Sequence, residues 1–208
     1  VMPTAVLSTH TGGFTGYTFR DLTDDMLPIA DHWSRLGEQF DCIFSGYLGS
    51  YRQLDIMQTI ADRFKTDKNI FIVDPVMGDN GKIYSNLDKS FAHGFAALCA
   101  RADIITPNLT EAALLTDFEY KSGGYGEDYI RSLLENLASG GTERIILTGV
   151  SFDSSSIGCA VYDGGKIDYL FNDKTEGMFH GSGDVFSSAL TGAILNGASL
   201  KKEARIAA

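Results

Sequence analysis

The sequence is short of positive charge. Its 208 residues include 17 Lys and Arg against 27 Asp and Glu, which gives a formal net charge of −10. Nucleic-acid and anionic-membrane surfaces usually need a basic face, so this balance argues against both kinds of partner. It still allows a small phosphorylated ligand, because backbone donors or a metal ion can bind such a ligand locally.

Cysteines and long apolar runs are also scarce. The three cysteines, Cys42, Cys99 and Cys159, are widely spaced and form no CxxC or Cys/His cluster. This usage is typical of buried free thiols in a reducing compartment. No apolar run approaches the roughly 18 residues that a membrane-spanning helix needs, and no signal peptide is visible. We therefore expect a cytoplasmic protein that does not enter a membrane.

What the sequence does contain is an alternation of strand-like and helix-like patterns. Hydrophobic residues make up 44% of it and charged residues 21%, as in an ordinary globular domain. Nearly continuous apolar strands between helices predict a mostly parallel sheet covered on both faces. Two strand-like runs around Asp163-Gly164-Gly165 predict a late β-hairpin. The predicted strands are 4–8, 41–46, 69–74, 102–106, 143–149 and the hairpin 157–171, and the predicted helices are 24–36, 50–65, 109–116, 127–139 and 181–197.

The pattern favours a single domain over residues 1–208, with no internal repeat or linker. The sequence starts at Val1 inside an apolar stretch, and residues 199–208 look like a helix that has just begun. We therefore expect a partial domain, cut at both ends.

Polar groups follow several predicted strands. Ligands of open α/β sheets bind outside the carboxyl ends of the strands. Turn chemistry alone explains each group, but together they predict a site at one edge of the sheet. These groups are Thr9-His10-Thr11-Gly12-Gly13, Gly46-Tyr47, Asp74 with the residues to Asp79, Pro107-Asn108 and Thr148-Gly149.

Two acids in this set suggest a metal site. Asp74 closes an apolar strand, so its carboxylate needs a hydrogen bond or a cation. Glu111 falls in the first turn of a predicted helix, where it can form a capping box with Asn108. Capping and metal coordination can coexist, because a carboxylate has several lone pairs. Two acids and an amide suit Mg²⁺ and suit zinc poorly.

The best candidate for an anion site is HGSGDVFSSAL, residues 180–190. The sequence has no GxxxxGK[ST], GxGxxG or GxSxG motif. Gly181, Ser182 and Gly183 would present backbone N–H groups at a helix N-terminus, which attracts phosphate. Their small size lets a ligand approach the backbone. The alternative is a plain helix start with Asp184 as an ordinary first-turn acid.

Five segments together resemble the pyridoxal kinase branch of the ribokinase-like superfamily. They are THTGGF (9–14), SGYLGS (45–50), DPVMGDNGKIY (74–84), TPNLTEAALL (106–115) and GSGDVFSSAL (181–190). The resemblance covers most of the chain. It implies a ribokinase-like three-layer α/β/α sandwich that transfers phosphate from ATP, with Mg²⁺, to the hydroxymethyl group of pyridoxal, pyridoxine or pyridoxamine. It also implies a homodimer.

The resemblance also implies residue roles. Asp184 would be the general base that accepts the hydroxymethyl proton, next to an anion hole formed by 181–183. Phosphoryl transfer needs positioning and charge neutralisation more than covalent help, which suits this assignment. By the same resemblance, Asp74, Asn108 and Glu111 would arrange Mg²⁺ and the ATP phosphates, and Thr148 would contact the nucleotide. Thr11, Tyr47 and His10 would contact the pyridine ring. Asp79 and Tyr84 would belong to a lid.

Two other functions stay open. Hydroxymethylpyrimidine kinases share the fold and the DPVM and TPN..E motifs, but often have cysteine where Asp184 stands and lack an SGYLGS-type segment. A non-catalytic ligand-binding protein on the same scaffold is the second, although the presence of Asp74, Glu111 and Asp184 argues against it. The family's usual first strand and helix and its terminal helices are missing, and Ser182 replaces a commoner threonine.

Overall fold

A six-stranded mixed sheet organises the computed structural model, which describes residues 1–9, 14–177, 179, 181–197 and 199–208. The strand order is β10-β9-β8-β7-β4-β3. The strands are β3 (Cys42–Ser45), β4 (Ile70–Val73), β7 (Ile104–Ile105), β8 (Arg144–Val150), β9 (Ser156–Asp163) and β10 (Lys166–Asp173). Strands β3, β4, β7 and β8 run parallel to one another, whereas β9 pairs antiparallel with both β8 and β10. The predicted mostly parallel sheet is confirmed.

The predicted late hairpin is also confirmed. Asp163 pairs with Lys166 across a two-residue turn. Gly164 and Gly165 have φ values of 56° and 92°. Both central residues of such a turn need positive φ, which glycine adopts without a steric penalty.

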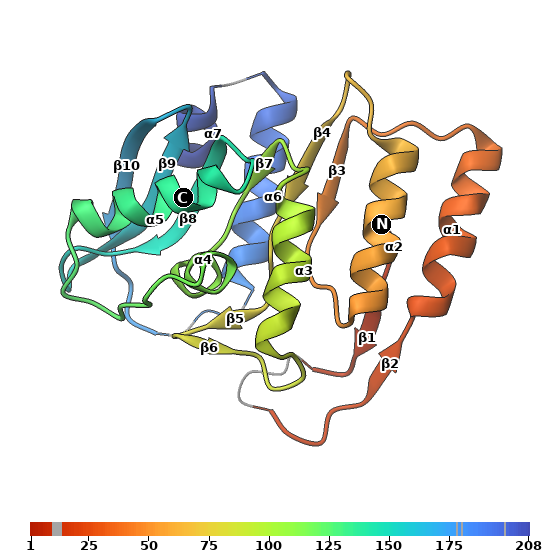
Figure 1. The fold of residues 1–208 in the computed structure, drawn as a ribbon, viewed down its shortest axis with the longest axis horizontal. Helices are drawn as coiled ribbons and strands as arrows, with labels where there is room; N and C mark the ends of the chain where they lie inside the picture. The colour runs from red at the N-terminus through yellow and green to blue at the C-terminus, as the bar shows by residue number, and fades with distance from the viewer. Residues whose placement is uncertain (10–13, 178, 180, 198) are drawn as a thin grey trace.

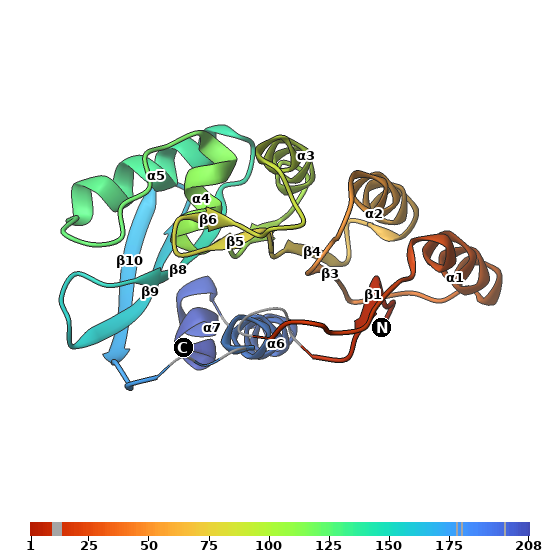
Figure 2. The same ribbon diagram turned by 90° about the horizontal axis from the view of Figure 1, so that it is seen from below.

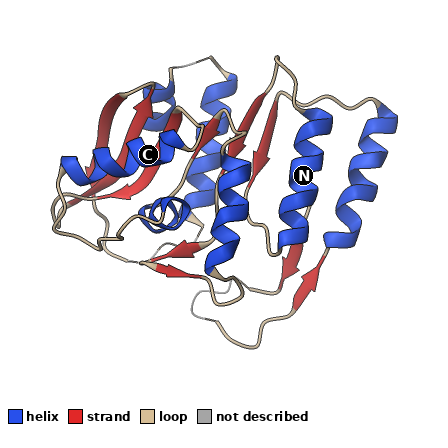
Figure 3. Ribbon diagram, viewed as in Figure 1, coloured by secondary structure: helices blue, strands red, loops and turns tan. Residues whose placement is uncertain are grey.

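Helices cover both faces of the sheet. Figure 2 shows α2 to α5 on one face and α6 and α7 on the other, with α1 beside α2. This arrangement gives the three predicted layers, which Figure 3 shows as blue helices around red strands. The helices are α1 (Thr23–Leu36), α2 (Tyr51–Phe64), α3 (Lys89–Cys99), α4 (Leu109–Thr116), α5 (Glu127–Ser139), α6 (Ser182–Leu195) and α7 (Leu200–Ala207).

The core is split by the sheet into two clusters. In β4, Phe71 and Val73 belong to the larger cluster, whereas Ile72 belongs to the smaller cluster with Leu190 of α6. Successive side chains of a strand point to opposite faces. A strand covered on both faces therefore has to be apolar throughout, which explains the continuous apolar run Ile70–Val73.

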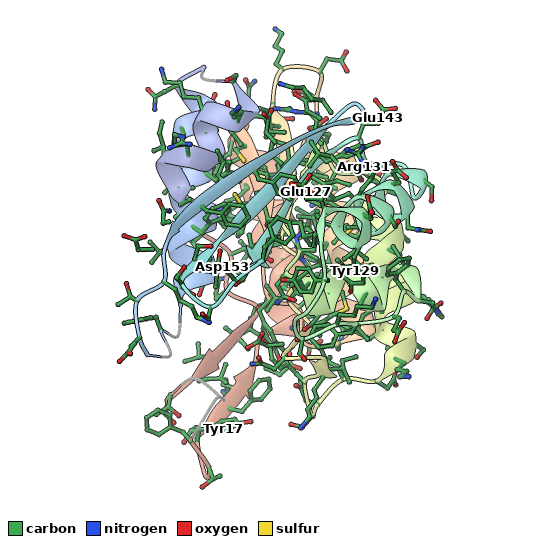
Figure 4. The ribbon with its side chains drawn as sticks, turned by 90° about the vertical axis from the view of Figure 1, so that its left-hand side faces the viewer. Tyr17, Glu127, Tyr129, Arg131, Glu143 and Asp153 are labelled. Carbon is green, nitrogen blue, oxygen red and sulfur yellow. The ribbon has the colours of Figure 1, made fainter. Side chains whose placement is uncertain are left out.

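The first predicted strand lies outside the central sheet, contrary to expectation. β1 (Ala5–Leu7) pairs with β2 (Phe19–Asp21) in an antiparallel ribbon. β1 has only three residues and exposes 56% of Val6, so it lacks the apolar run of a strand buried on both faces. Figure 4 shows this ribbon extending from the body, with Tyr17 toward its far end.

The described helices and the cysteines bear on two further sequence expectations. No helix among the described residues is long and apolar enough to cross a membrane. All three cysteines are free; Cys99 and Cys159 are buried, as expected, and Cys42 is half-buried.

Candidate active site

The carboxyl ends of the parallel strands lie at one edge of the sheet. In Figure 1, β3 and β4 run toward this lower edge, where the hairpin β5 (Gly78–Asp79) and β6 (Lys82–Ile83) and the start of α6 also lie. Asp74 directly follows β4, and Asn108 follows β7 and forms a parallel bridge with Thr148. The topology therefore brings together several of the predicted site residues.

Asp74 is buried at this edge, with 8% of its surface exposed. Its N–H donates to the carbonyl of Ser45 at 2.8 Å, and Ser187 Oγ donates to its Oδ2 at 3.2 Å. Burial, together with the charge of Asp184 and against the opposing effect of the Ser187 hydrogen bond, raises the pKa of Asp74 to about 7. The Ser187 bond therefore ties the first turns of α6 to the end of β4.

Glu111 is 3% exposed and anchors the neighbouring loop. Its Oε2 accepts from the Asn108 N–H at 2.8 Å, and its Oε1 accepts from the Met77 N–H at 3.2 Å. Asn108 Oδ1 accepts from the Glu111 N–H at 3.0 Å, so the predicted capping box is confirmed. Burial raises the pKa of Glu111 well above its ordinary value, and the charge of Asp74 adds to this shift.

Asn108 and Thr148 are held in place by the main chain. Asn108 Nδ2 donates to the Gly78 carbonyl at 2.9 Å, which fastens the β5–β6 hairpin to α4. The Thr148 N–H donates to the Pro107 carbonyl at 2.9 Å. Both residues thus have a structural role at the sheet edge, and their predicted contacts with nucleotide remain predictions.

The pKa of Tyr84 responds to the acids of this region. Tyr84 follows β6 and is half-buried. Burial, together with the charges of four carboxylates, raises its pKa to about 12; the four are Glu111, Asp79, Asp74 and Asp184. The charges of the two predicted metal ligands and of the predicted base are therefore felt at Tyr84, and the lid role of Asp79 and Tyr84 remains a prediction.

The buried acids at this edge suit a cation that takes most of its ligands from water and phosphate oxygens. No ion pair joins Asp74, Glu111 or Asp184 to a basic side chain in the described part of the chain. No group of three or more His, Cys, Asp or Glu among the described residues could form a protein cage for a metal. Mg²⁺ usually takes one or two carboxylates and completes its shell with water and phosphate oxygens. Two buried carboxylates without a basic partner suit that mode of binding.

The start of α6 is open to solvent. Gly181 caps the helix with a φ of 85°, a backbone conformation that favours glycine. Residues 181–184 are exposed, and the Val185 N–H donates to the Gly181 carbonyl at 3.0 Å, which closes the first turn. The preceding N–H groups of a first helical turn have no partner within the helix. The predicted anion hole at 181–183 remains a prediction.

Tyr47 lies in the segment between β3 and α2. It is half-buried, and its hydroxyl accepts from Asn86 Nδ2 at 3.0 Å. Burial raises its pKa. The other two predicted ring contacts, His10 and Thr11, lie outside the described residues, so the structure leaves their predicted contacts with the ring untested.

Sequence reasoning missed Ser187. Its partner Asp74 lies 113 residues away in the chain. The available signal was its position three residues after Asp184 on α6, which places both residues on neighbouring parts of one helix surface.

A sequence model described as phosphomethylpyrimidine kinase matches residues 39–208. The chain belongs to the phosphomethylpyrimidine kinase family. One curated relative is a Schizosaccharomyces pombe protein that is provisionally named a pyridoxal kinase. It is 32% identical to this chain over 165 residues, which cover 74% of this chain and 46% of that protein. The chain spans about half the length of the curated relatives it matches.

Two solved structures of family relatives resemble the chain over almost its whole length. The pyridoxal kinase of Lactobacillus plantarum is 30% identical with a TM-score of 0.88, covering 99% of this chain and 72% of that one. A Bacteroides thetaiotaomicron protein, provisionally assigned as a phosphomethylpyrimidine kinase, is 36% identical with a TM-score of 0.93, covering 99% of this chain and 71% of that one. The predicted α/β fold and the resemblance to pyridoxal kinases are confirmed.

Proposed function

We propose that the chain forms the core of an ATP-dependent kinase for the hydroxymethyl group of pyridoxal, pyridoxine or pyridoxamine. One observation carries the proposal: the Ser187–Asp74 hydrogen bond of 3.2 Å joins the helix that bears Asp184 to a buried carboxylate at the sheet edge. In this proposal the bond would join the anion-binding helix start and the base to the cation site. The Lactobacillus relative is a pyridoxal kinase, and the Bacteroides relative has also been crystallised with pyridoxal.

In the proposed reaction Asp184 accepts the proton of the substrate hydroxyl as the oxygen attacks the γ-phosphorus of ATP. The bond from that phosphorus to the β–γ bridging oxygen breaks, and ADP leaves. In a loose transition state the alcohol keeps its proton until late, so an ordinary carboxylate suffices as the acceptor. The N–H groups of Gly181, Ser182 and Gly183 would stabilise the transferred phosphoryl oxygens.

Asp74 and Glu111 would hold Mg²⁺, Glu111 through water because both its oxygens accept backbone N–H groups. The ion, when bound, neutralises charge on the ATP phosphates. Asn108 and Thr148 would face the nucleotide. Asp79 and Tyr84 would close over ATP and substrate and exclude water.

The remaining parts of the proposal concern the substrate ring and the whole molecule. Tyr47, Thr11 and His10 would contact the pyridine ring. The chain would act as one domain in the cytoplasm. It would form a homodimer, and analytical sedimentation or light scattering would measure the mass of that dimer.

A phosphorylation assay tests the activity directly. The purified protein is given ATP, Mg²⁺ and, separately, each of the three B6 vitamers and hydroxymethylpyrimidine, and the products are identified by mass spectrometry. We expect phosphorylated vitamers. Preference for the pyrimidine would instead support the second candidate, hydroxymethylpyrimidine kinase, which the name of the matching family favours. ATP binding without transfer to any of the four compounds would support a non-catalytic ligand-binding protein.

A further inference from the structure

One buried amide, Gln53 of α2, lies beneath the segment that carries Tyr47. Only 2% of its surface is exposed. Its Oε1 accepts from the Gly49 N–H at 2.7 Å, and its Nε2 donates to the Thr4 carbonyl and to Thr23 Oγ1, both at 2.9 Å. The amide therefore has a partner for its oxygen and for both of its N–H groups.

Two of these partners support Tyr47 directly. Thr4 Oγ1 donates to the Tyr47 carbonyl at 3.0 Å. The Tyr47 ring lies over Gly49, because a Cβ added at Gly49 would come within 3.0 Å of Tyr47 Oη and 3.4 Å of Cε1. Gln53 thus fixes both the backbone and the surface on which the ring rests.

The third partner connects the same amide to the β1–β2 ribbon. The hydroxyl and the N–H of Thr23 both donate to Asp21 Oδ1, at the end of β2. The Leu22 N–H donates to the Thr4 carbonyl at 3.1 Å, alongside Gln53 Nε2. The ribbon, the start of α1 and the Tyr47 segment therefore meet at one side chain.

We propose that Gln53 is a positioning residue that sets the wall of the B6 ring site by holding Tyr47 through Gly49 and Thr4. The inference rests on the proposed function, in which Tyr47 contacts the ring. Gln53 itself touches no substrate. A residue of this kind affects binding of the vitamer more than binding of ATP or the transfer step.

Gln53→Glu is the most specific variant, because it keeps the size of the side chain and the acceptor for Gly49. The carboxylate has no N–H to donate and places an oxygen against the Thr4 carbonyl. We expect the KM for pyridoxal to rise roughly tenfold, with kcat and the KM for ATP within about twofold, because uniform binding of one substrate is lost. Thr4→Val removes only the bond to the Tyr47 carbonyl and should give a smaller rise in the same constant.

Gln58→Glu is the matched control, since Gln58 lies on the same helix outside this network. It should leave all three constants unchanged. The proposal would be overturned if Gln53→Glu changed the KM for pyridoxal and the KM for ATP equally. It would also be overturned if neither Gln53→Glu nor Thr4→Val changed the KM for pyridoxal. If Gln53→Glu fails to fold, Thr4→Val decides between these outcomes.

Amide hydrogen exchange separates this inference from the proposed function. In Gln53→Leu the Gly49 N–H loses its acceptor, so exchange at 46–50 should accelerate while α5 keeps its protection. Unchanged exchange at 46–50 would contradict the positioning role even in a protein that phosphorylates pyridoxal. Accelerated exchange in a protein that does not phosphorylate it would show that the proposed function alone has failed.

Discussion

The two sides of the proposed phosphate site are built in opposite ways. On the sheet side, Asp74 and Glu111 are buried and accept hydrogen bonds from Ser187 and from the backbone. On the helix side, residues 181–184 are exposed, and no hydrogen bond to the Asp184 side chain is found within the described residues. The sheet side is part of the folded framework, whereas the helix side is open to a ligand. Substitutions on the two sides should therefore differ in their effect on stability.

The largest effect is expected on the helix side, from Asp184→Asn. Loss of a general base should lower kcat by roughly 10²-fold or more. The affinity for ATP and the free energy of unfolding should change little, because the side chain is exposed. Steady-state kinetics, nucleotide titration and chemical denaturation give the three values.

Asp128→Asn is the matched control for a plain helix-start role. Asp128 is also an exposed first-turn acid, at the start of α5. If both variants change only stability, by the same few tenths of a kcal/mol that a first-turn charge contributes, Asp184 is an ordinary helix-start acid and not the base.

On the sheet side, Glu111→Ala should lower stability, in contrast to Asp184→Asn. It leaves the N–H groups of Met77 and Asn108 without their acceptor, which typically costs about 1–3 kcal/mol for a buried group. Urea denaturation measures the loss. A free energy of unfolding within about 0.5 kcal/mol of the wild type, as for ordinary surface substitutions, would show that the two sides do not differ in this way.

The pH dependence of stability sharpens the same comparison. Asp74 keeps its proton up to about pH 7 in the folded protein, whereas an unfolded aspartate loses it near 3.8. A rise in pH between these values favours the unfolded state, so the stability linked to this group is complete below about pH 4 and is lost on approaching pH 7.

Asp74→Asn should flatten this fall in stability, measured by urea denaturation from pH 5 to pH 8 in the presence of EDTA. Addition of Mg²⁺ at pH 8 should stabilise the wild type more than the variant. Parallel curves for the two proteins would mean that Asp74 does not titrate in this range.

The smallest effect is expected from Ser182→Thr, which restores the commoner residue of the family. Backbone N–H groups, and not this side chain, are proposed to bind phosphate, so kcat and both KM values should stay within about twofold. A change of tenfold, equivalent to about 1.4 kcal/mol, would show that the hydroxyl takes part.

The sequence predicted the features whose signal is local. The capping box of Asn108 and Glu111 is complete within four consecutive residues, and the hairpin depends on the Gly164-Gly165 turn. The continuous apolar run of β4 indicated a strand buried on both faces. The placement of Asp184 in the first turn of α6 followed from the small residues before it.

The features that it did not predict depend on distant partners. Helix α3 contains Gly94, a poor helix former, because a Cβ there would lie 2.7 Å from Leu54 Cδ1 of α2. Close packing of α3 against α2 thus explains why Gly94 stands in α3, where it weakens the sequence signal for a helix. Ser187 has a distant partner as well, and the pairing of β1 with β2 depends on contacts across a long loop.

The central claim is that the sheet edge and the start of α6 form one phosphate-transfer site. A crystal structure with a non-hydrolysable ATP analogue, Mg²⁺ and pyridoxal tests it most directly. The account predicts the γ-phosphate against the N–H groups of 181–183, and an Asp184 oxygen about 2.6–3.2 Å from the substrate hydroxyl, within hydrogen-bond reach. Pyridoxal bound away from this edge, or Asp184 turned away from its hydroxyl, would contradict the account.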